Sequence, residues 1–290
     1  MTRIITSLSE ISESYDALFC DLWGCVHDGL APFAEAVAAL QAFRARGGTV
    51  MLVTNAPRAH APVRRQLDRL GVPSDAYDGI ATSGDSARAA MLRGAVGEKV
   101  YFIGQPHDQD FFAPLELIEN PVTISQVPLE QAEGMVCCGP FDPLADPKEM
   151  RAQFLQAKTR GLKLLCANPD IVVDRGETRE WCAGALAKLY TEMGGESLYF
   201  GKPHPPIYDL ARRRLQALGK DIPDSRILCV GDGILTDIDG AMGEDLDSLF
   251  ITGGLAARET QTIEHPDPAA LVAYLTKEMR QPTYCIGKLR

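Results

Sequence analysis

Short apolar runs alternate with longer amphipathic segments along most of the chain. The short runs have the length and composition of strands, and they lie at 17–22, 49–54, 80–83, 100–103, 135–138, 163–167, 198–200, 226–230 and 248–251. The longer segments carry apolar residues at helical spacing, and they lie at 33–46, 60–70, 84–93, 147–160, 179–193, 205–218, 234–242 and 268–279. Strands that alternate with helices are typical of βαβ units. The pattern therefore predicts an α/β fold built on a Rossmann-like, doubly wound parallel sheet.

Polar residues at the strand ends suggest how the chain is divided. They follow strands before residue 60 and again after residue 225, at Asp21, Thr54-Asn55 and Gly231-Asp232. The region between also alternates strands and helices, but it has no such polar ends until Asn168-Pro169-Asp170. We therefore expect a discontinuous core made of residues 1–82 and 195–290, with a second α/β domain at 83–194 inserted into it.

Composition and charge exclude several classes of protein. With 46% hydrophobic and 23% charged residues, the chain is not of the disordered kind. It carries 29 basic and 39 acidic residues, and a net charge of −10 argues against a nucleic-acid partner. No apolar run approaches the ~18–20 residues that a membrane-spanning helix needs. Residues 1–13 are polar and do not resemble a signal peptide.

The eight cysteines show no C-x-x-C pair. Several lie inside apolar runs, as Cys20 and Cys229 do, where cysteine serves as a small core residue. This usage favours a reducing, cytoplasmic location.

Side chains that can act as nucleophiles, metal ligands or anion-binding groups follow the strands of the predicted core. In an open parallel sheet, ligands bind beyond the carboxyl ends of the strands. A carboxylate there can attack phosphorus or hold Mg²⁺, while lysine and threonine bind negative charge. One such residue alone is more typical of a turn or a helix cap, but the combination favours phosphoryl transfer. The residues at these ends are Asp21, Thr54, Asn55, Lys202, Asp232 and Asp237.

The segments that contain these residues resemble the motifs of the haloacid dehalogenase (HAD) superfamily, in particular its class IIA, NagD-like phosphatases. The resemblance extends over nearly the whole chain. It is carried by Asp21-Leu22-Trp23-Gly24-Cys25-Val26, Leu52-Val53-Thr54-Asn55, Phe200-Gly201-Lys202-Pro203 and Gly231-Asp232-Gly233-Ile234-Leu235-Thr236-Asp237. It implies the HAD fold, with an α/β cap domain inserted between the second and third of these motifs.

The resemblance also implies the reaction, a phosphate hydrolysis that passes through an aspartyl-phosphate. Asp21 is the expected nucleophile. Thr54 and Asn55 are expected to bind the transferring phosphoryl group, and Lys202 to offset charge between that group and Asp21. These four residues form the expected catalytic set.

Mg²⁺ is the cofactor that the resemblance implies. The expected ligands are Asp21, the main-chain carbonyl of Trp23 and Asp232, while Asp237 is expected to bind the metal or to orient its waters. A phosphate dianion repels a carboxylate nucleophile, so this cation and a lysine have to offset the charge while the reacting groups are held in line.

Trp23 departs from the family pattern, because these phosphatases usually carry a second aspartate there as general acid. Loss of a general acid costs about 10²–10⁴-fold in rate, and an indole N–H donates a hydrogen bond but cannot shuttle protons. Several explanations stay open. His27 or Asp28 supplies the proton, the leaving group needs none (as in an acyl phosphate), or the protein binds phosphorylated ligands as a regulator. The dehalogenase branch has an aromatic residue at this position, but that reaction would leave the acidic fourth motif unexplained.

The inserted domain is expected to contact the substrate through Asn168 and Asp170, although Asn-Pro-Asp is also an ordinary turn sequence. We expect a small phosphorylated metabolite as the partner, and neither nucleic acid nor a membrane. A homodimer formed through the cap stays open, and the sequence does not identify which metabolite is bound.

Overall fold

The computed structural model describes residues 2–113, 120–175 and 178–290. The chain forms two compact units. The core unit comprises Met1–Thr54, Arg64–Ala81 and Lys202–Arg290. The insert unit comprises Asn55–Val63 and Thr82–Gly201. The fold is the predicted α/β kind, with a largely parallel sheet in each unit.

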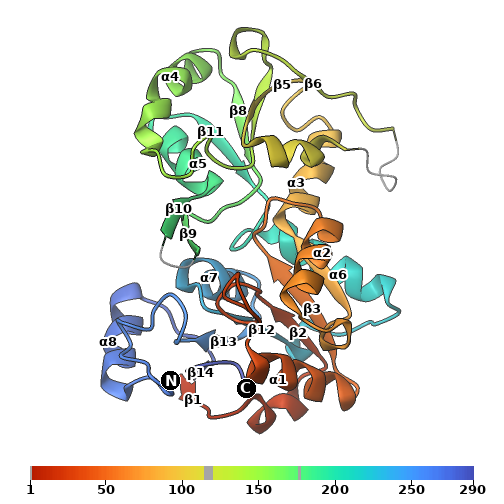
Figure 1. The fold of residues 1–290 in the computed structure, drawn as a ribbon, viewed down its shortest axis with the longest axis vertical. Helices are drawn as coiled ribbons and strands as arrows, with labels where there is room; N and C mark the ends of the chain where they lie inside the picture. Colours follow the sequence, from red (N-terminus) through yellow and green to blue (C-terminus); the bar gives the residue numbers. More distant parts are fainter. Residues whose placement is uncertain (1, 114–119, 176–177) are drawn as a thin grey trace. The chain divides into compact units, whose positions relative to one another are not determined.

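The core unit contains a seven-stranded sheet in the order β1-β14-β13-β12-β2-β3-β4. The strands are β1 (Arg3–Ile4), β2 (Ala17–Cys20), β3 (Thr49–Thr54), β4 (Gly79–Thr82), β12 (Ile227–Gly231), β13 (Asp247–Ile251) and β14 (Tyr284–Ile286). The pairings from β1 to β3 are all parallel, and β1 and β14 bring the two ends of the chain together (Figure 1). From β2 the chain adds strands on one side, and from β12 on the other. The direction in which successive strands are added therefore reverses between β2 and β12, a point that we call the sheet reversal. Doubly wound sheets bind ligands at this point.

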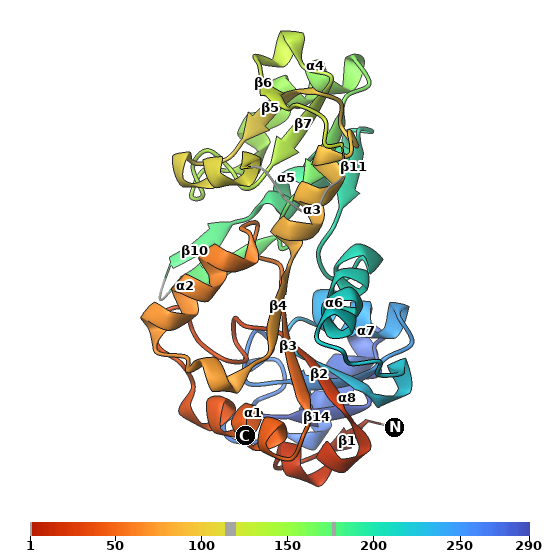
Figure 2. The same cartoon turned by 90° about the vertical axis from the view of Figure 1, so that its right-hand side faces the viewer.

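Helices cover both faces of the core sheet, as its fully buried strands require. Phe19 of β2 and Met51 of β3 belong to the apolar cluster beneath α6, whereas the alternate residues Leu18 and Val50 point to the opposite face. Figure 2 shows α1 and α6 on either side of β2 and β3. The helices are α1 (Ala34–Ala45), α2 (His60–Leu70), α6 (Pro205–Ala217), α7 (Asp239–Gly243) and α8 (Pro268–Glu278), with short 3₁₀ turns at Leu8–Glu10, Ser12–Ser14, Ser74–Ala76 and Asp224–Arg226.

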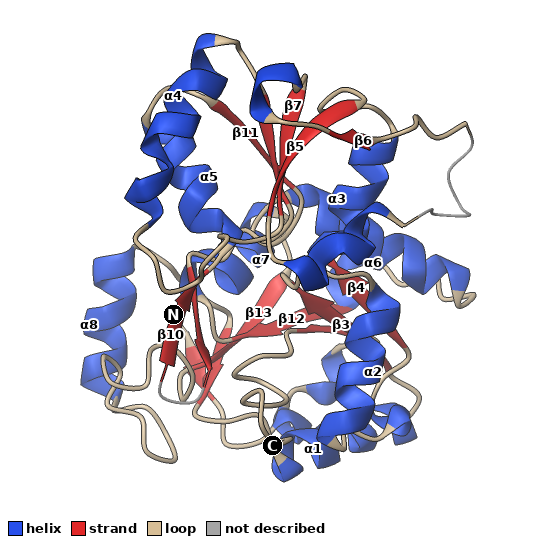
Figure 3. Cartoon of the chain, turned by 45° about the horizontal axis from the view of Figure 1, so that its top comes forward, coloured by secondary structure: helices blue, strands red, loops and turns tan. Residues whose placement is uncertain are grey.

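The insert unit is a smaller α/β layer structure. Its parallel sheet has the order β11-β8-β7-β5-β6. Figure 3 shows α4 and α5 on one side of this sheet and α3 on the other. The elements are α3 (Ser83–Leu92), β5 (Lys99–Ile103), β6 (Ser125–Gln126), β7 (Gly134–Cys137), α4 (Arg151–Thr159), β8 (Lys163–Cys166), α5 (Ala183–Glu192) and β11 (Glu196–Tyr199), with 3₁₀ turns at Pro106–Phe112, Leu129–Gln131 and Pro147–Met150. Over the described residues, no helix is long and apolar enough to cross a membrane.

The observed boundary after the insert differs from the predicted one. The sequence places residues from 195 onward in the core, but β11 pairs with β8 and the insert unit ends at Gly201. The side chains of Leu198 and Phe200 pack against the insert's own apolar cluster, which holds this strand there. The insert unit also includes Asn55–Val63, which the sequence assigns to the core.

A β-hairpin occupies part of a segment predicted as helix. The sequence predicts a helix over 179–193, but β9 (Val172–Arg175) and β10 (Thr178–Trp181) pair antiparallel, and α5 begins only at Ala183. The short strands β1, β6 and β14 are also absent from the predicted pattern. A strand of two or three residues carries too few positions to show a period, so its assignment depends on the strands it pairs with.

The cysteines are core residues, as predicted. Every one of the eight lies in the described part of the chain, is buried, and is a free thiol.

Asp78 connects three segments of the core unit, and its removal should destabilise that unit. Its carboxylate accepts hydrogen bonds from Arg44 of α1, at 2.9 and 2.6 Å, and from the Val50 N–H at 2.8 Å. Because the carboxylate is only 23% exposed, Asp78→Ala should lower the free energy of unfolding by about 1–3 kcal/mol in urea denaturation. The control is Asp75→Ala, which removes one exposed hydrogen bond from Gln41. Equal losses in the two variants would contradict the assignment.

Candidate active site

Asp21 directly follows β2, at the point where the core sheet reverses direction. Its backbone N–H donates to the carbonyl of Val230 on β12 at 2.8 Å, so the strand pairing continues one residue beyond β2. The side chain is 13% exposed. Asp21 is thus a carboxylate that is fixed by the two central strands and still reachable from solvent.

Lys202 is the central cation of the site. Its Nζ lies 2.6 Å from Asp21 Oδ1 and 2.7 Å from Asp237 Oδ1, and its side chain is 4% exposed. Burial lowers the pKa of Lys202, but the charges of Asp21 and Asp237 outweigh this and hold the pKa above its ordinary value. The lysine therefore stays charged and holds the two carboxylates close together.

Asp237 lies in a single π-helical turn, Ile234–Ile238, that follows β12. The N–H groups of Asp237 and Ile238 both donate to the carbonyl of Gly233, and the Gly233 N–H donates to Asp237 Oδ2 at 3.1 Å. Burial raises the pKa of Asp237 to about 6, although Lys202 acts in the opposite direction. Each Asp237 oxygen thus has a protein donor, and the widened turn aims the carboxylate at Lys202.

Two glycines make room for the carboxylate of Asp232, the residue after β12. A Cβ atom at Gly24 would lie 2.2 Å from Asp232 Oδ2, and one at Gly254 would lie 2.0 Å from it. Gly24 also has φ +75°, a conformation that favours glycine. The Leu255 N–H donates to Asp232 Oδ2 at 3.0 Å. The sequence motifs missed this contribution from the loop after β13, although its Gly253-Gly254 pair is a visible turn signal.

The electrostatics of Asp232 favour binding of a cation. Burial raises the pKa of Asp232 well above its ordinary value, and the charges of Asp21 and Asp237 raise it further. Asp21 and Asp237 contact one ammonium and Asp232 lies nearby, so the fully ionised cluster carries a formal charge of −2. Buried charges need a partner, and carboxylate oxygens are hard ligands that suit Mg²⁺. The donor set therefore fits a divalent cation held by Asp21 and Asp232.

A thiol that the sequence predicts as a core residue lies beside these carboxylates. The ligand atoms of Asp21, Cys25 and Asp232 all lie within 4.8 Å of one another. Asp237 lies outside this trio and contacts Lys202; its predicted role toward the metal or its waters stays a prediction. Burial, and then the charges of Asp232 and Asp21, raise the pKa of the Cys25 thiol well above its usual range.

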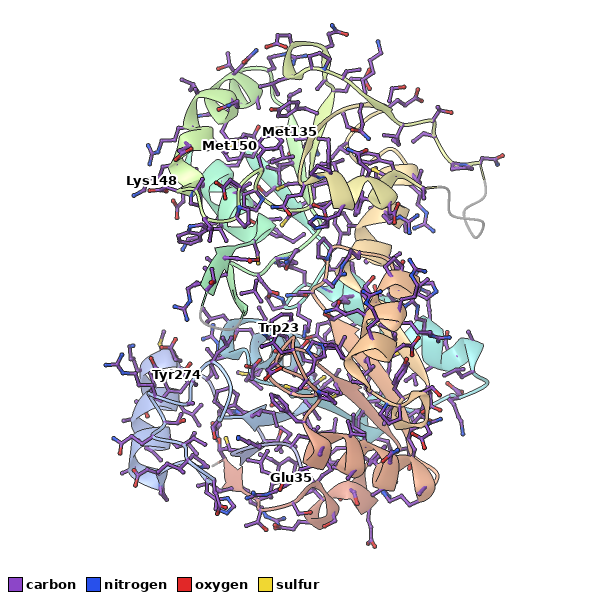
Figure 4. All side chains as sticks on the ribbon, in the orientation of Figure 1. Trp23, Glu35, Met135, Lys148, Met150 and Tyr274 are labelled. Carbon is purple, nitrogen blue, oxygen red and sulfur yellow. The ribbon has the colours of Figure 1, made fainter. Side chains whose placement is uncertain are left out.

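Trp23 lies in the tight loop after β2 (Figure 4). The Gly24 N–H donates to the carbonyl of His27 at 2.9 Å and closes the loop. The Trp23 ring meets the His27 ring edge-on at a centroid distance of 5.4 Å. A Cβ atom at Gly29 would lie 2.3 Å from Trp23 Cη2, so the indole packs against this glycine backbone. Trp23 is therefore a packed part of the loop after β2.

His27 and Asp28, the two substitute acids suggested by the sequence, both have structural roles in this loop. His27 is 3% exposed, its Nδ1 accepts from the Gly29 N–H at 3.0 Å, and burial lowers its pKa to about 4. Asp28 Oδ1 accepts from the N–H groups of Leu30 and Ala31, and these bonds lower the pKa of Asp28. Around pH 7 the histidine is neutral and the aspartate is ionised, so neither is poised as a proton donor.

The remaining predicted residues divide between the two units. Thr54 ends β3 in the core unit and is 8% exposed, whereas Asn55 begins the insert unit. Asn55 Nδ2 donates to Asp170 Oδ1 at 2.8 Å, and the Asp170 N–H donates to Asn168 Oδ1 at 3.0 Å. The Asn-Pro-Asp segment is thus a turn whose aspartate binds the Asn55 side chain, a pairing that the sequence does not indicate.

Comparison with known proteins points to one family over most of the chain. A family model described as haloacid dehalogenase-like hydrolase matches residues 18–117, and one described as HAD-hydrolase-like matches residues 199–277. A haloacid dehalogenase-like hydrolase structure from Brucella suis 1330 is 38% identical and covers 99% of this chain and 100% of its own, with a TM-score of 0.85.

Two more distant relatives have named activities. The 5'-nucleotidase YutF of Bacillus subtilis is 24% identical over 279 residues, which are 96% of this chain and 97% of the relative. Glycerol phosphate phosphatase of Mycobacterium tuberculosis, in a structure with magnesium, is 25% identical over 99% of this chain and 78% of its own, with a TM-score of 0.66. With the site at its sheet reversal and these matches over its whole length, the chain belongs to the haloacid dehalogenase-like hydrolase family.

Proposed function

We propose that this protein is a Mg²⁺-dependent phosphohydrolase of small phosphorylated metabolites, with Asp21 as the nucleophile. The observation that carries the proposal is the buried Lys202, which binds Asp21 and Asp237 together beside Asp232. The relatives support the substrate class. A 5'-nucleotidase and a glycerol phosphate phosphatase act on different metabolites that share a phosphate monoester.

The reaction we infer has two displacements at phosphorus. An oxygen of Asp21 attacks the phosphorus, the bond to the leaving oxygen breaks, and the phosphoryl group is left on Asp21 as an acyl phosphate. Water then attacks this phosphorus, which releases inorganic phosphate and restores the Asp21 carboxylate. Lys202 offsets negative charge in both steps, and Thr54 and Asn55 are proposed contacts to the phosphoryl oxygens.

The metal role falls to Asp21, Asp232 and the main-chain carbonyl of Trp23. Mg²⁺, when bound, supplies positive charge against the phosphoryl oxygens. Because Asp237 is hydrogen-bonded to Lys202 and Gly233, we propose that it positions the lysine. The insert unit is the proposed substrate-selecting domain, and Asn168 and Asp170 stay predicted substrate contacts.

The leaving group determines how far the reaction can proceed without a general acid. His27 and Asp28 are committed to the loop, and Trp23 cannot shuttle a proton. Substrates whose leaving oxygen is a weak base, such as aryl or acyl phosphates, need no proton in the first step. We therefore propose a preference for such substrates. The lack of a proton donor in this loop is also consistent with an alternative function, in which the protein binds phosphorylated ligands without hydrolysing them.

Asp232→Ala should weaken Mg²⁺ binding, because it removes a proposed ligand whose carboxylate lies between Gly24 and Gly254. We expect calorimetry to show at least about a tenfold weaker Mg²⁺ affinity, of the size that losing a charged ligand produces. Asp221→Ala, in an exposed loop of the same unit, is the control and should bind as the wild type does. A wild-type protein that binds no Mg²⁺ at millimolar concentration would refute the proposed function.

Acid should destabilise the fold through His27. Its pKa is about 4 in the folded protein and about 6.5 when unfolded. Between pH 6.5 and pH 4 His27 is protonated in the unfolded state but neutral in the folded state. The stability present above pH 6.5 is therefore lost as the pH falls toward 4, and the loss is complete below that value. The loss amounts to about 3 kcal/mol when complete.

The wild type is compared with His27→Gln, whose side chain can still accept the hydrogen bond from the Gly29 N–H but does not titrate. In urea denaturation of metal-free protein, the wild type should lose more stability between pH 7 and 4.5. Parallel profiles would contradict the assignment.

Trp23→Asp tests whether only the general acid is missing. The wild type should hydrolyse p-nitrophenyl phosphate far better than an alkyl phosphate. Trp23→Asp should raise alkyl-phosphate hydrolysis by about 10²-fold or more, the usual contribution of a placed acid. Trp23→Phe keeps an aromatic ring without an acid and should show no such gain.

Thermal stability must be measured for both variants, because the indole packs against Gly29. Equal wild-type rates on aryl and alkyl phosphates would mean that another residue supplies the proton. A folded, Mg²⁺-binding Trp23→Asp variant without activity on any phosphate would favour the binder.

A further inference from the structure

Cys25 is a buried group that the proposed reaction does not use. It lies four residues after Asp21 and is 1% exposed. The Cys25 and Val26 N–H groups both donate to the carbonyl of Leu22, at 3.3 and 2.8 Å, and these bonds fix the turn that carries it. The turn brings the thiol to the two carboxylates expected to hold the metal.

The geometry of this group suits a single ion. The ligand atoms of Asp21, Cys25 and Asp232 are at most 4.8 Å apart, so there is a point within about 2.8 Å of all three. Metal–sulfur distances near 2.3 Å and metal–oxygen distances near 2.0 Å characterise Zn²⁺ sites, so side-chain shifts of about 0.5–0.8 Å or less would complete the coordination. Among the described residues, no other trio of potential metal ligands meets this criterion.

The chemistry of the donors differs from that of an all-oxygen site. Mg²⁺ takes oxygen ligands and leaves a thiol unused, whereas thiolate ligands select softer cations such as Zn²⁺. Three protein ligands with an open fourth position are also the pattern of reactive zinc sites.

We propose that Asp21, Cys25 and Asp232 bind Zn²⁺, or another thiophilic divalent cation, in place of Mg²⁺, with Cys25 as a thiolate ligand. The thiol proton goes to solvent when the metal–sulfur bond forms, and no electron is transferred. Because Asp21 and Asp232 are also the proposed Mg²⁺ ligands, an ion held this way excludes Mg²⁺ from the site. The predicted consequence is inhibition by Zn²⁺, and this part of the inference rests on the proposed function.

The test uses Co²⁺, whose bond to a thiolate gives an intense ultraviolet charge-transfer band that oxygen ligands do not give. Wild-type protein, purified with reductant and freed of metal, is titrated with Co²⁺ and then with Zn²⁺. Cys25→Ser and Cys25→Val are compared with Cys285→Ala, which removes a buried thiol from β14 in the same unit. Circular dichroism and thermal melting show that each variant is folded.

We expect the band in the wild type and in Cys285→Ala, its displacement by Zn²⁺, and its absence in both Cys25 variants. Zinc should inhibit p-nitrophenyl phosphate hydrolysis at a concentration at least tenfold lower in the wild type than in Cys25→Val. A band that persists in folded Cys25→Val would overturn the proposal, as would wild-type protein that binds Co²⁺ without a band. If the wild type shows no phosphatase activity, the proposed function fails, but the Co²⁺ spectrum still decides the thiolate ligand.

Discussion

The buried contact between Lys202 and two carboxylates is the constraint on which the site depends. Taking an ammonium out of water is costly unless charged partners compensate it, and here Asp21 and Asp237 lie 2.6 and 2.7 Å from its nitrogen. Both partners follow strands next to the sheet reversal, so the pairing of β2 with β12 brings them to the lysine. The same contact explains the widened turn at Ile234–Ile238, which delivers the Asp237 side chain to the lysine.

Space is the second constraint, and glycines supply it. The carboxylate of Asp232 occupies positions that a Cβ atom at Gly24 or Gly254 would fill. A similar contact at Gly231, whose Cβ would lie 2.0 Å from Asp237 Cγ, leaves no room for any larger residue. The backbone therefore approaches Asp232 and Asp237 closely, and both side chains are largely buried. In such surroundings charges interact strongly, which favours a cation at the site.

The alternation of strands and helices predicts the fold class, because the apolar residues of each element are those that it buries. The α/β fold of each unit agrees with this prediction. The residues at the site could be predicted for the same reason, since Asp21 and Asp232 directly follow buried strands. Three features depend on contacts between distant segments and leave no local pattern. β11 joins the insert because Leu198 and Phe200 fit its apolar cluster, Asp170 meets Asn55, and the Leu255 N–H reaches Asp232. A single sequence does not report such pairings.

The nucleophile loop combines two residues that change the chemistry of an otherwise ordinary donor set. Trp23 removes the proton donor, and packing against Gly29 gives the indole a structural reason to be there. Cys25 adds a thiol next to the carboxylates. In the proposed reaction the first change restricts which leaving groups can depart, and the proposed thiolate ligand widens the range of cations that can bind. Both would act at Asp21, the first on the phosphorus–oxygen bond that its attack breaks and the second on the cation that it helps to hold. Substrate and metal selectivity are coupled in this proposal through a loop of five residues, Asp21 to Cys25, whose first residue is hydrogen-bonded to β12.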